Sequence, residues 1–147
     1  MLQEKSCGAV VFIRKPELLF LLLHYEEGHW GFVKGNVEFN ETEKETVLRE
    51  LKEETGIIKA KFIEGFREII TYTYTRNGNL VHKQVVFFLI ETQTKAIKLS
   101  YEHSGFIWLP FIDGINTLPF KNSKNILKKA NVFLKKNKAS SSCFNRL

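Results

Sequence analysis

The sequence predicts an α/β fold in which a mixed β-sheet lies between helices. Several segments rich in β-branched and aromatic residues alternate with polar turns, a pattern typical of strands. Two segments carry apolar residues at helical spacing, one in the middle of the chain and one near its end. A sheet that is apolar on both faces needs cover on both sides, so these elements together predict a sandwich.

The first predicted element is a β-hairpin. Residues 6–13 and 18–23 are mostly apolar or β-branched, and Pro16 interrupts them. Proline cannot donate to the hydrogen-bond ladder of a sheet, so it marks the connection between the two strands. The glycine-containing stretch 26–40 that follows predicts a loop with one short strand.

The second predicted element is a helix over residues 42–55, and both of its ends carry a signal. Thr42 and Glu45 have the spacing of a capping box, in which each side chain bonds the backbone of the other residue. Gly56 stands where a left-handed residue commonly ends a helix. We expect this helix to pack on the sheet through Val47, Leu48 and Leu51.

The second half of the chain predicts three more strands and a second long helix. Residues 60–75 and 80–91 are rich in Ile, Phe, Tyr, Thr and Val, and the Asn77-Gly78 pair between them favours a tight turn. Residues 105–109 predict a short buried strand that ends at Pro110. The helix is amphipathic, with lysines on its polar side and an apolar face made of Ile126, Leu127, Ala130, Phe133 and Leu134.

Length and spacing predict one domain over residues 1–137 and a flexible C-terminal tail over residues 138–147. The 147 residues suffice for one hydrophobic core. Periodicity is lost after Asn137, so we expect the tail to be frayed. No internal repeat divides the chain.

The net charge of +6 favours anionic partners. Many of the excess lysines lie near the C-terminus, where a solvated helix face is a more common explanation than a nucleic-acid site. The two cysteines have no metal-site or disulfide spacing, which fits a reducing, cytoplasmic setting. No apolar run approaches the roughly 20 residues needed to cross a bilayer, and no signal-peptide pattern opens the chain. We therefore expect a soluble cytoplasmic protein without a membrane partner.

Three glutamates crowd the end of the central helix: Glu50, Glu53 and Glu54. At about 100° per residue they fall within an arc of roughly 100°. Glu53 and Glu54 lie in the last turn, where the helix dipole is negative, so each costs about 0.3–1 kcal/mol, and three acids within about one turn also repel one another. A solvated acidic face, which is the alternative, leaves these costs without compensation. A divalent cation compensates these costs, because Mg²⁺ prefers carboxylate oxygens. The bound cation can also activate a water to attack phosphorus. The sequence therefore predicts a Mg²⁺ site, in which Mn²⁺ can substitute.

The residues around these acids form the pattern G-x5-E-x7-R-E-L-x-E-E-x-G-I. This pattern resembles the signature of the Nudix hydrolase family at every defined position, namely Gly35, Glu41, Arg49, Glu50, Leu51, Glu53, Glu54, Gly56 and Ile57. The resemblance implies a Nudix-type α/β/α sandwich and a metal-dependent pyrophosphohydrolase. It also implies that Gly35, Glu50, Glu53 and Glu54 are metal ligands, with Glu50 as ligand or base.

Two positions of the pattern also have a physical explanation. Glycine at position 35 lets the backbone approach a metal or phosphate that a side chain would obstruct. Arg49 lies one turn after Glu45 and can bridge the acids, so that it holds Glu50 in a productive orientation.

Outside the signature, the chain resembles the asymmetrical diadenosine tetraphosphate hydrolase branch of that family. The similar segments are Ser-Cys-Gly-Ala at 6–9, His-Trp-Gly-Phe-Val-Lys-Gly at 29–35 and Glu-Gly-Phe at 64–66. This resemblance implies that Lys34 and Lys83 contact phosphate and that Tyr72 or Tyr74 stacks on adenine. Ordinary cross-strand packing is the alternative role of either tyrosine. Val33 departs from the branch, in which proline is usual at that position.

The resemblance also covers the loop from Leu99 to His103, from which relatives supply one more acid. Glu102 is therefore expected to be a second metal ligand or a base, with a solvated loop glutamate as the alternative.

The expected reaction is hydrolysis of diadenosine tetraphosphate to ATP and AMP. The alternative substrates are RNA 5′ ends and nucleoside or deoxynucleoside triphosphates, and a nucleotide-binding module without catalysis is the alternative class. The intact set of acids favours the enzyme, because a binding module does not need all three glutamates. The sequence indicates no obligate protein partner.

Overall fold

The structure is a computed structural model that describes the backbone of residues 1–145 and the side chains of residues 1–137. Its strands are β1 (Leu2–Ile13), β2 (Leu19–Tyr25), β3 (Trp30–Gly31), β4 (Val33–Asn36), β5 (Lys61–Phe62), β6 (Glu68–Arg76), β7 (Asn79–Glu91) and β8 (His103–Leu109). Its helices are α1 (Glu43–Thr55), α2 (Phe111–Thr117) and α3 (Lys121–Asn145).

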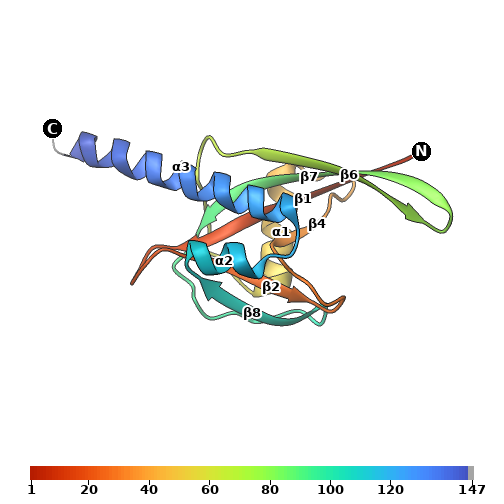
Figure 1. The fold of residues 1–147 in the computed structure, drawn as a ribbon, viewed down its shortest axis with the longest axis horizontal. Helices are drawn as coiled ribbons and strands as arrows, with labels where there is room; N and C mark the ends of the chain where they lie inside the picture. Colours follow the sequence, from red (N-terminus) through yellow and green to blue (C-terminus); the bar gives the residue numbers. More distant parts are fainter. Residues whose placement is uncertain (146–147) are drawn as a thin grey trace.

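β1 lies at the centre of an eight-stranded mixed sheet. It runs parallel to β7 on one side, and on the other side it pairs antiparallel with β4 and then with β2. β5 and β6 pair with β7, while β3 and β8 pair with β2. In Figure 1 the β6–β7 hairpin extends beyond the other strands, toward the N-terminus. The mixed sheet and the first hairpin are as predicted.

Alternate residues of β1 supply two separate hydrophobic cores, because successive strand side chains point to opposite faces. Val10 and Phe12 pack with α3 residues such as Leu127. Ala9 and Val11 belong to a second core that includes Val47, Leu51 and Ile57. Figure 1 shows α1 on one side of the sheet and α2 and α3 on the other. The α/β/α sandwich is thereby confirmed.

The glutamate-bearing helix α1 has the predicted ends. Thr42 and Glu45 form the complete capping box, and Gly56 ends the helix at φ 76°. One packing residue was predicted wrongly, since Leu48 is 42% exposed. It lies about 100° around the helix from Val47, beyond the arc that faces the sheet.

The segment 60–75 is divided where one strand was predicted. β5 and β6 flank a turn at Gly65, whose φ of 94° favours glycine. The strand predicted at 105–109 is β8, which begins two residues earlier. The prediction that this strand is buried was wrong, since Phe106 is 40% and Ile107 is 37% exposed. α2 was not predicted, because Pro110 was interpreted as the end of a strand. It is also the N-cap of α2, a position near which proline is well tolerated.

The last helix, α3, is longer than predicted and continues to Asn145, where irregular backbone was expected after Asn137. The residues that follow Asn137 are mainly Lys, Ala and Ser without Gly or Pro, so they contain no helix breaker. Residues 146–147 of the predicted tail lie outside the described residues. Among the helices that the structure describes, none is both long and apolar enough to span a membrane.

Candidate active site

A groove of about 830 Å³ lies beside the C-terminal part of α1. Its walls also include β4, the turn after β2, the loop before β8 and one residue each of β1 and β7. The groove brings together seven residues that were predicted for the site: Lys34, Gly35, Glu50, Glu53, Glu54, Lys83 and Glu102. Long-range folding has therefore collected these groups on one surface.

Glu54 is the buried acid of the groove, with 3% of its surface exposed. One carboxylate oxygen, Oε1, accepts a hydrogen bond from the Lys34 backbone N–H at 3.3 Å. Burial and the adjacent Glu50 carboxyl raise the pKa of Glu54 well above its usual range. In the absence of a cation, the raised pKa favours the protonated form of Glu54.

Glu50 and Gly35 are in close contact across the helix–strand interface. A Cβ atom on Gly35 would overlap the Glu50 carboxyl group. β4 pairs with β1 through Gly35 and Cys7, so the strand cannot easily move away from α1. Only glycine at this position allows the Glu50 carboxyl to lie against the strand.

Arg49 holds Glu50 from the side of α1. Its Nη1 donates to Glu50 Oε1 at 2.8 Å, and its Nη2 donates to the Asn36 carbonyl at 2.9 Å. Glu45, one turn earlier, was the expected acidic partner of Arg49. This expectation was wrong, because the Glu45 carboxylate is engaged in the capping box. Arg49 instead forms a bidentate pair with Glu41 at 2.6 and 3.0 Å. This pair lowers the pKa of Glu41 to about 2.

Glu53 differs from the other two glutamates in being exposed, with 58% of its side chain in contact with solvent. One of its oxygens lies 3.4 Å from Arg49 Nη1. Within the part of the chain that the structure describes, no three Asp, Glu, His or Cys side chains converge as a closed metal cage. The closest match to a cation site is the wall formed by Glu50, Glu54 and the Gly35 backbone.

This wall fits a hard divalent cation by the chemistry of its donors. Mg²⁺ and Mn²⁺ take carboxylate and carbonyl oxygens, and Mg²⁺ usually keeps several waters with one or two carboxylates. Burial first, and the adjacent Glu50 carboxyl second, raise the pKa of Glu54, and a bound cation would stabilise its charged form against both. Because position 35 is glycine, the Glu50 carboxyl lies directly against the backbone of β4.

Two lysines supply positive charge within the same groove. Burial lowers the pKa of Lys34, with the second lysine, Lys83, as a smaller cause. Lys83 Nζ donates to Glu4 Oε1 at 2.9 Å and to Asn36 Oδ1 at 3.0 Å. The groove thus joins an acidic wall to two cationic groups, an arrangement suited to a metal and a polyphosphate.

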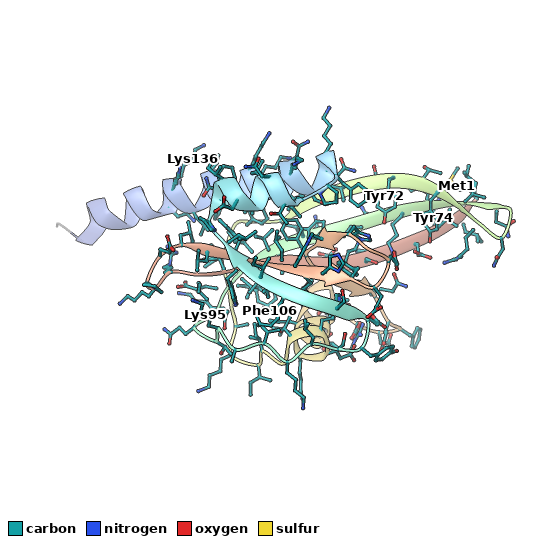
Figure 2. The ribbon with its side chains drawn as sticks, turned by 60° about the horizontal axis from the view of Figure 1, so that its bottom comes forward. Met1, Tyr72, Tyr74, Lys95, Phe106 and Lys136 are labelled. Carbon is teal, nitrogen blue, oxygen red and sulfur yellow. The ribbon has the colours of Figure 1, made fainter. Side chains whose placement is uncertain are left out.

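The predicted tyrosines lie beside the groove and not in its lining. Figure 2 shows Tyr72 and Tyr74 on the extended part of β6. Tyr72 is exposed and stands directly opposite Lys83 on β7, so both side chains are on one face of the sheet. The Tyr74 hydroxyl donates to Glu4 Oε1 at 2.9 Å. The two rings are 6.2 Å apart, on a shared face as predicted.

Glu102 enters the groove from the loop before β8, on a segment distant from α1 in sequence. Its neighbour Tyr101, which was not predicted, also lines the groove and is 89% exposed. Seven other lining residues were also missed, namely Ser6, Tyr25, Glu26, Glu27, Asn36, Glu38 and Ser100. The signal for Asn36 is its place directly after Gly35. No spacing signals Tyr25, whose position depends on the pairing of β2 with β8.

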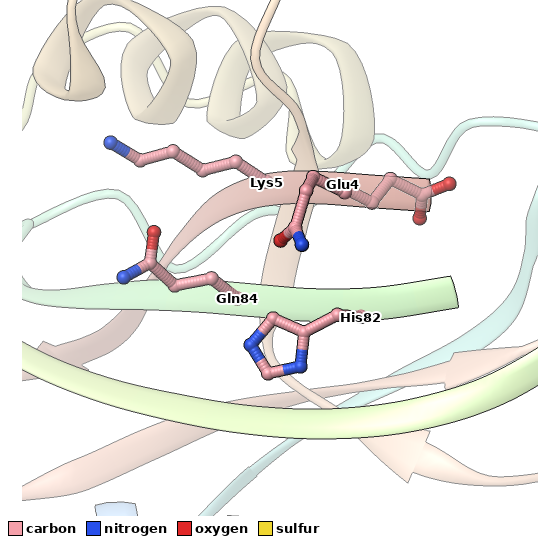
Figure 3. A pocket seen from close by; sticks show the side chains of 5 residues that line it. Glu4, Lys5, His82 and Gln84 are labelled. Carbon is pink, nitrogen blue, oxygen red and sulfur yellow. The ribbon is translucent and has the colours of Figure 1, made fainter. Parts of the chain in front are cut away.

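A smaller hollow of about 270 Å³ lies over β1 and β7 and does not have the same chemistry. Figure 3 shows Glu4 and Lys5 leaving β1 in different directions beside His82 and Gln84 of β7. The Glu4 carboxylate is already bonded to Lys83, and Lys5 pairs with Glu43. No pair of adjacent acids lines this hollow.

Known proteins resemble this chain in sequence and in fold. The NUDIX domain family matches residues 4–129. The chain is 34% identical over 143 residues to the asymmetrical bis(5′-nucleosyl)-tetraphosphatase of Mus musculus, and the match covers 88% of this chain and 95% of the relative.

Two solved structures are similar over most of their length. An Ap4A hydrolase from C. elegans superposes with a TM-score of 0.76 at 26% identity and covers 90% of this chain and 98% of its own. The E. coli dihydroneopterin triphosphate pyrophosphohydrolase superposes with a TM-score of 0.72 at 16% identity, covering 88% of this chain and 97% of its own. The second likeness shows the fold alone.

Proposed function

The chain belongs to the Nudix hydrolase family, and on that premise we propose that it is a divalent-metal-dependent pyrophosphohydrolase that cleaves diadenosine tetraphosphate to ATP and AMP. The observation that carries the proposal is the groove in which Glu50 and Glu54 adjoin each other and share one space with Lys34 and Lys83. Acids of this kind suit a cation, and lysines suit a chain of phosphates.

Glu50, Glu54 and the Gly35 carbonyl are the proposed cation ligands, with exposed Glu53 as a further one. When bound, Mg²⁺ or Mn²⁺ would screen the phosphate charge and make water a stronger nucleophile. The residues of the chain do the rest. Arg49 keeps Glu50 from turning toward solvent through its bond at 2.8 Å.

The opposite parts of the groove are proposed to bind the substrate and to handle the proton. Lys34 and Lys83 contact phosphate oxygens, because the flexible side chain of lysine can adjust its charged end to the position of a negative group. Glu102 lines the same groove as the glutamates of α1, and either Glu102 or Glu50 accepts a proton from the attacking water. Tyr72, on the same face as Lys83, provides a surface for one adenine.

The substrate follows from the relatives and from the charge of the groove. The mouse relative and the C. elegans structure are both named for dinucleoside tetraphosphate hydrolysis. A tetraphosphate carries several negative charges, which two lysines and a cation can compensate. Attack by water at one end of the phosphate chain gives ATP and AMP.

A substrate panel tests this proposal. Initial rates at equal concentration should be at least tenfold higher for diadenosine tetraphosphate than for deoxynucleoside triphosphates or 5′-triphosphate RNA, all with Mg²⁺. A preference for the RNA would transfer the activity to RNA 5′ ends. Binding of all three without turnover, with Mg²⁺ or Mn²⁺ present, would show a nucleotide-binding module without catalysis.

A further inference from the structure

His103, at the start of β8, has a buried ring whose second nitrogen lacks a partner. None of its side chain is exposed. Nδ1 lies 3.1 Å from the Ser100 hydroxyl, and the ring packs against Tyr25 with centroids 4.5 Å apart. Among the side chains that the structure describes, Nε2 is the only buried polar atom without a hydrogen-bond partner.

The orphaned nitrogen faces the buried acid of the groove. His103 Nε2 lies 4.0 Å from Glu54 Oε1, the same oxygen that the Lys34 N–H reaches at 3.3 Å. Both distances exceed the value of about 2.9–3.0 Å that is usual for N–H···O bonds. Hydrogen bonds in ligand-free active sites are often long and shorten in the complex.

The partner of Nδ1 determines which ring nitrogen of the neutral His103 carries the proton. When the Ser100 hydroxyl donates to Nδ1, the neutral ring carries its proton on Nε2 and presents it to Glu54. An unsatisfied buried N–H costs about 1–3 kcal/mol, which an apolar residue of similar size would avoid. Packing against Tyr25 alone therefore does not account for histidine at this position.

We propose that His103 is a positioning residue for Glu54, and that its Nε2–H bonds the Glu54 carboxylate when that carboxylate holds the divalent cation. The inference rests on the proposed function, because His103 is proposed to orient a ligand of the same cation. Groups that hydrogen-bond metal-ligating carboxylates fix their orientation, and their loss typically lowers metal affinity or activity 10–100-fold.

Mn²⁺ binding to the purified full chain tests the inference. Binding is measured as the decrease of the free Mn²⁺ signal in electron paramagnetic resonance. His103→Leu fills a similar volume without a donor and should weaken binding about tenfold or more. His103→Gln keeps an N–H donor near the position of Nε2 and should remain within about threefold of wild type. In steady-state assays of diadenosine tetraphosphate hydrolysis, His103→Leu should lower kcat more than it changes KM, because His103 does not line the groove.

A matched control is available in His24, whose Nδ1 pairs with the Ser104 hydroxyl at 2.6 Å and which does not line the groove. His24→Leu should bind Mn²⁺ as wild type does. Circular dichroism and thermal melting identify variants that fold. A folded His103→Leu with wild-type Mn²⁺ affinity would overturn the inference and leave the histidine a packing residue.

Ser100→Ala decides the question if both His103 variants misfold. It removes the donor that fixes the ring proton and should weaken Mn²⁺ binding at least about threefold, whereas wild-type affinity would overturn the inference. Failure of the proposed function is a different result, because the wild-type chain itself would then bind no Mn²⁺, and both proposals would fall together.

Discussion

The Glu50 carboxyl occupies the space that a side chain on Gly35 would need. This contact joins the first residue of the Nudix signature to one of its glutamates, which are fifteen positions apart in the chain. The glycine is required because the helix and the strand meet at this point, and the site depends on how closely they meet.

Gly35→Ala should reduce turnover of diadenosine tetraphosphate by at least about a hundredfold, because the added methyl displaces Glu50 or β4. Steady-state kinetics with Mg²⁺ measure the effect, and thermal melting reports the fold. Gly105→Ala is the control, since its Cβ would meet neighbours only at the ordinary distance of 3.8 Å. Activity within about threefold of wild type in Gly35→Ala would show that the close contact is not needed for turnover.

Glu54→Gln should leave the metal-free protein as stable as wild type, within about 1 kcal/mol, but lower turnover by at least about a hundredfold. The raised pKa of Glu54 keeps it protonated at pH 7 without metal, so a neutral amide of the same shape replaces a neutral acid. Urea unfolding in EDTA and kinetics in Mg²⁺ test the two parts separately.

Glu53→Gln is expected to have the same effect on turnover, although Glu53 is exposed. Glu17→Gln, at an exposed residue outside the groove, is the control. Wild-type activity in both Glu53→Gln and Glu54→Gln would reject the assignment of these residues to a cation site.

Tyr72→Ala should raise KM for diadenosine tetraphosphate by about tenfold and change kcat little, since stacking on a base is worth about 1–3 kcal/mol and acts far from phosphorus. Tyr72→Phe should retain the wild-type KM. Tyr74→Ala provides the comparison, because the Tyr74 hydroxyl is bonded to Glu4. If KM is unchanged in Tyr72→Ala, the ring has only a packing role on β6.

Glu43→Gln should reduce stability at pH 7 by about 1–2 kcal/mol, because solvent screens the ion pairs of this partly exposed carboxylate. Arg67, with Lys5 as a second partner, lowers the pKa of Glu43 from 4.5 to about 2. A lowered pKa contributes stability above the unfolded value, and this contribution is lost as pH falls from 4.5 toward 2. The difference between variant and wild type in urea should therefore narrow below about pH 4.5, and a difference independent of pH would contradict this origin.

Much of the fold could be predicted because its signals are local. The capping box of Thr42 and Glu45, the left-handed Gly56 and the Asn-Gly turn act within a few residues. Two features could not be recognised in this way, namely the presence of α2 and the C-terminal end of α3. α2 follows Pro110, which also fits a strand end, and the extent of α3 depends on a sequence without helix breakers.

The site was predictable as a set of residues but not as a geometry. Helical spacing places Glu50, Glu53 and Glu54 on one side of α1. Only tertiary contacts, with the Lys34 backbone of β4 and with His103 of β8, distinguish buried Glu54 from exposed Glu53. Arg49 was expected to bridge acids, but its main partner, Glu41, lies outside α1. His103 gave no signal in the sequence, because its relation to Glu54 requires the pairing of β8 with β2.

Hydrolysis of diadenosine tetraphosphate in ¹⁸O-labelled water, with product separation and mass spectrometry, tests the central claim most directly. With Mg²⁺ the reaction should yield ATP and AMP in equal amounts, with one ¹⁸O atom in one of the two products, and EDTA should stop it. Formation of two ADP molecules, or turnover that continues unchanged in EDTA, would contradict a cation-dependent attack at one end of the phosphate chain.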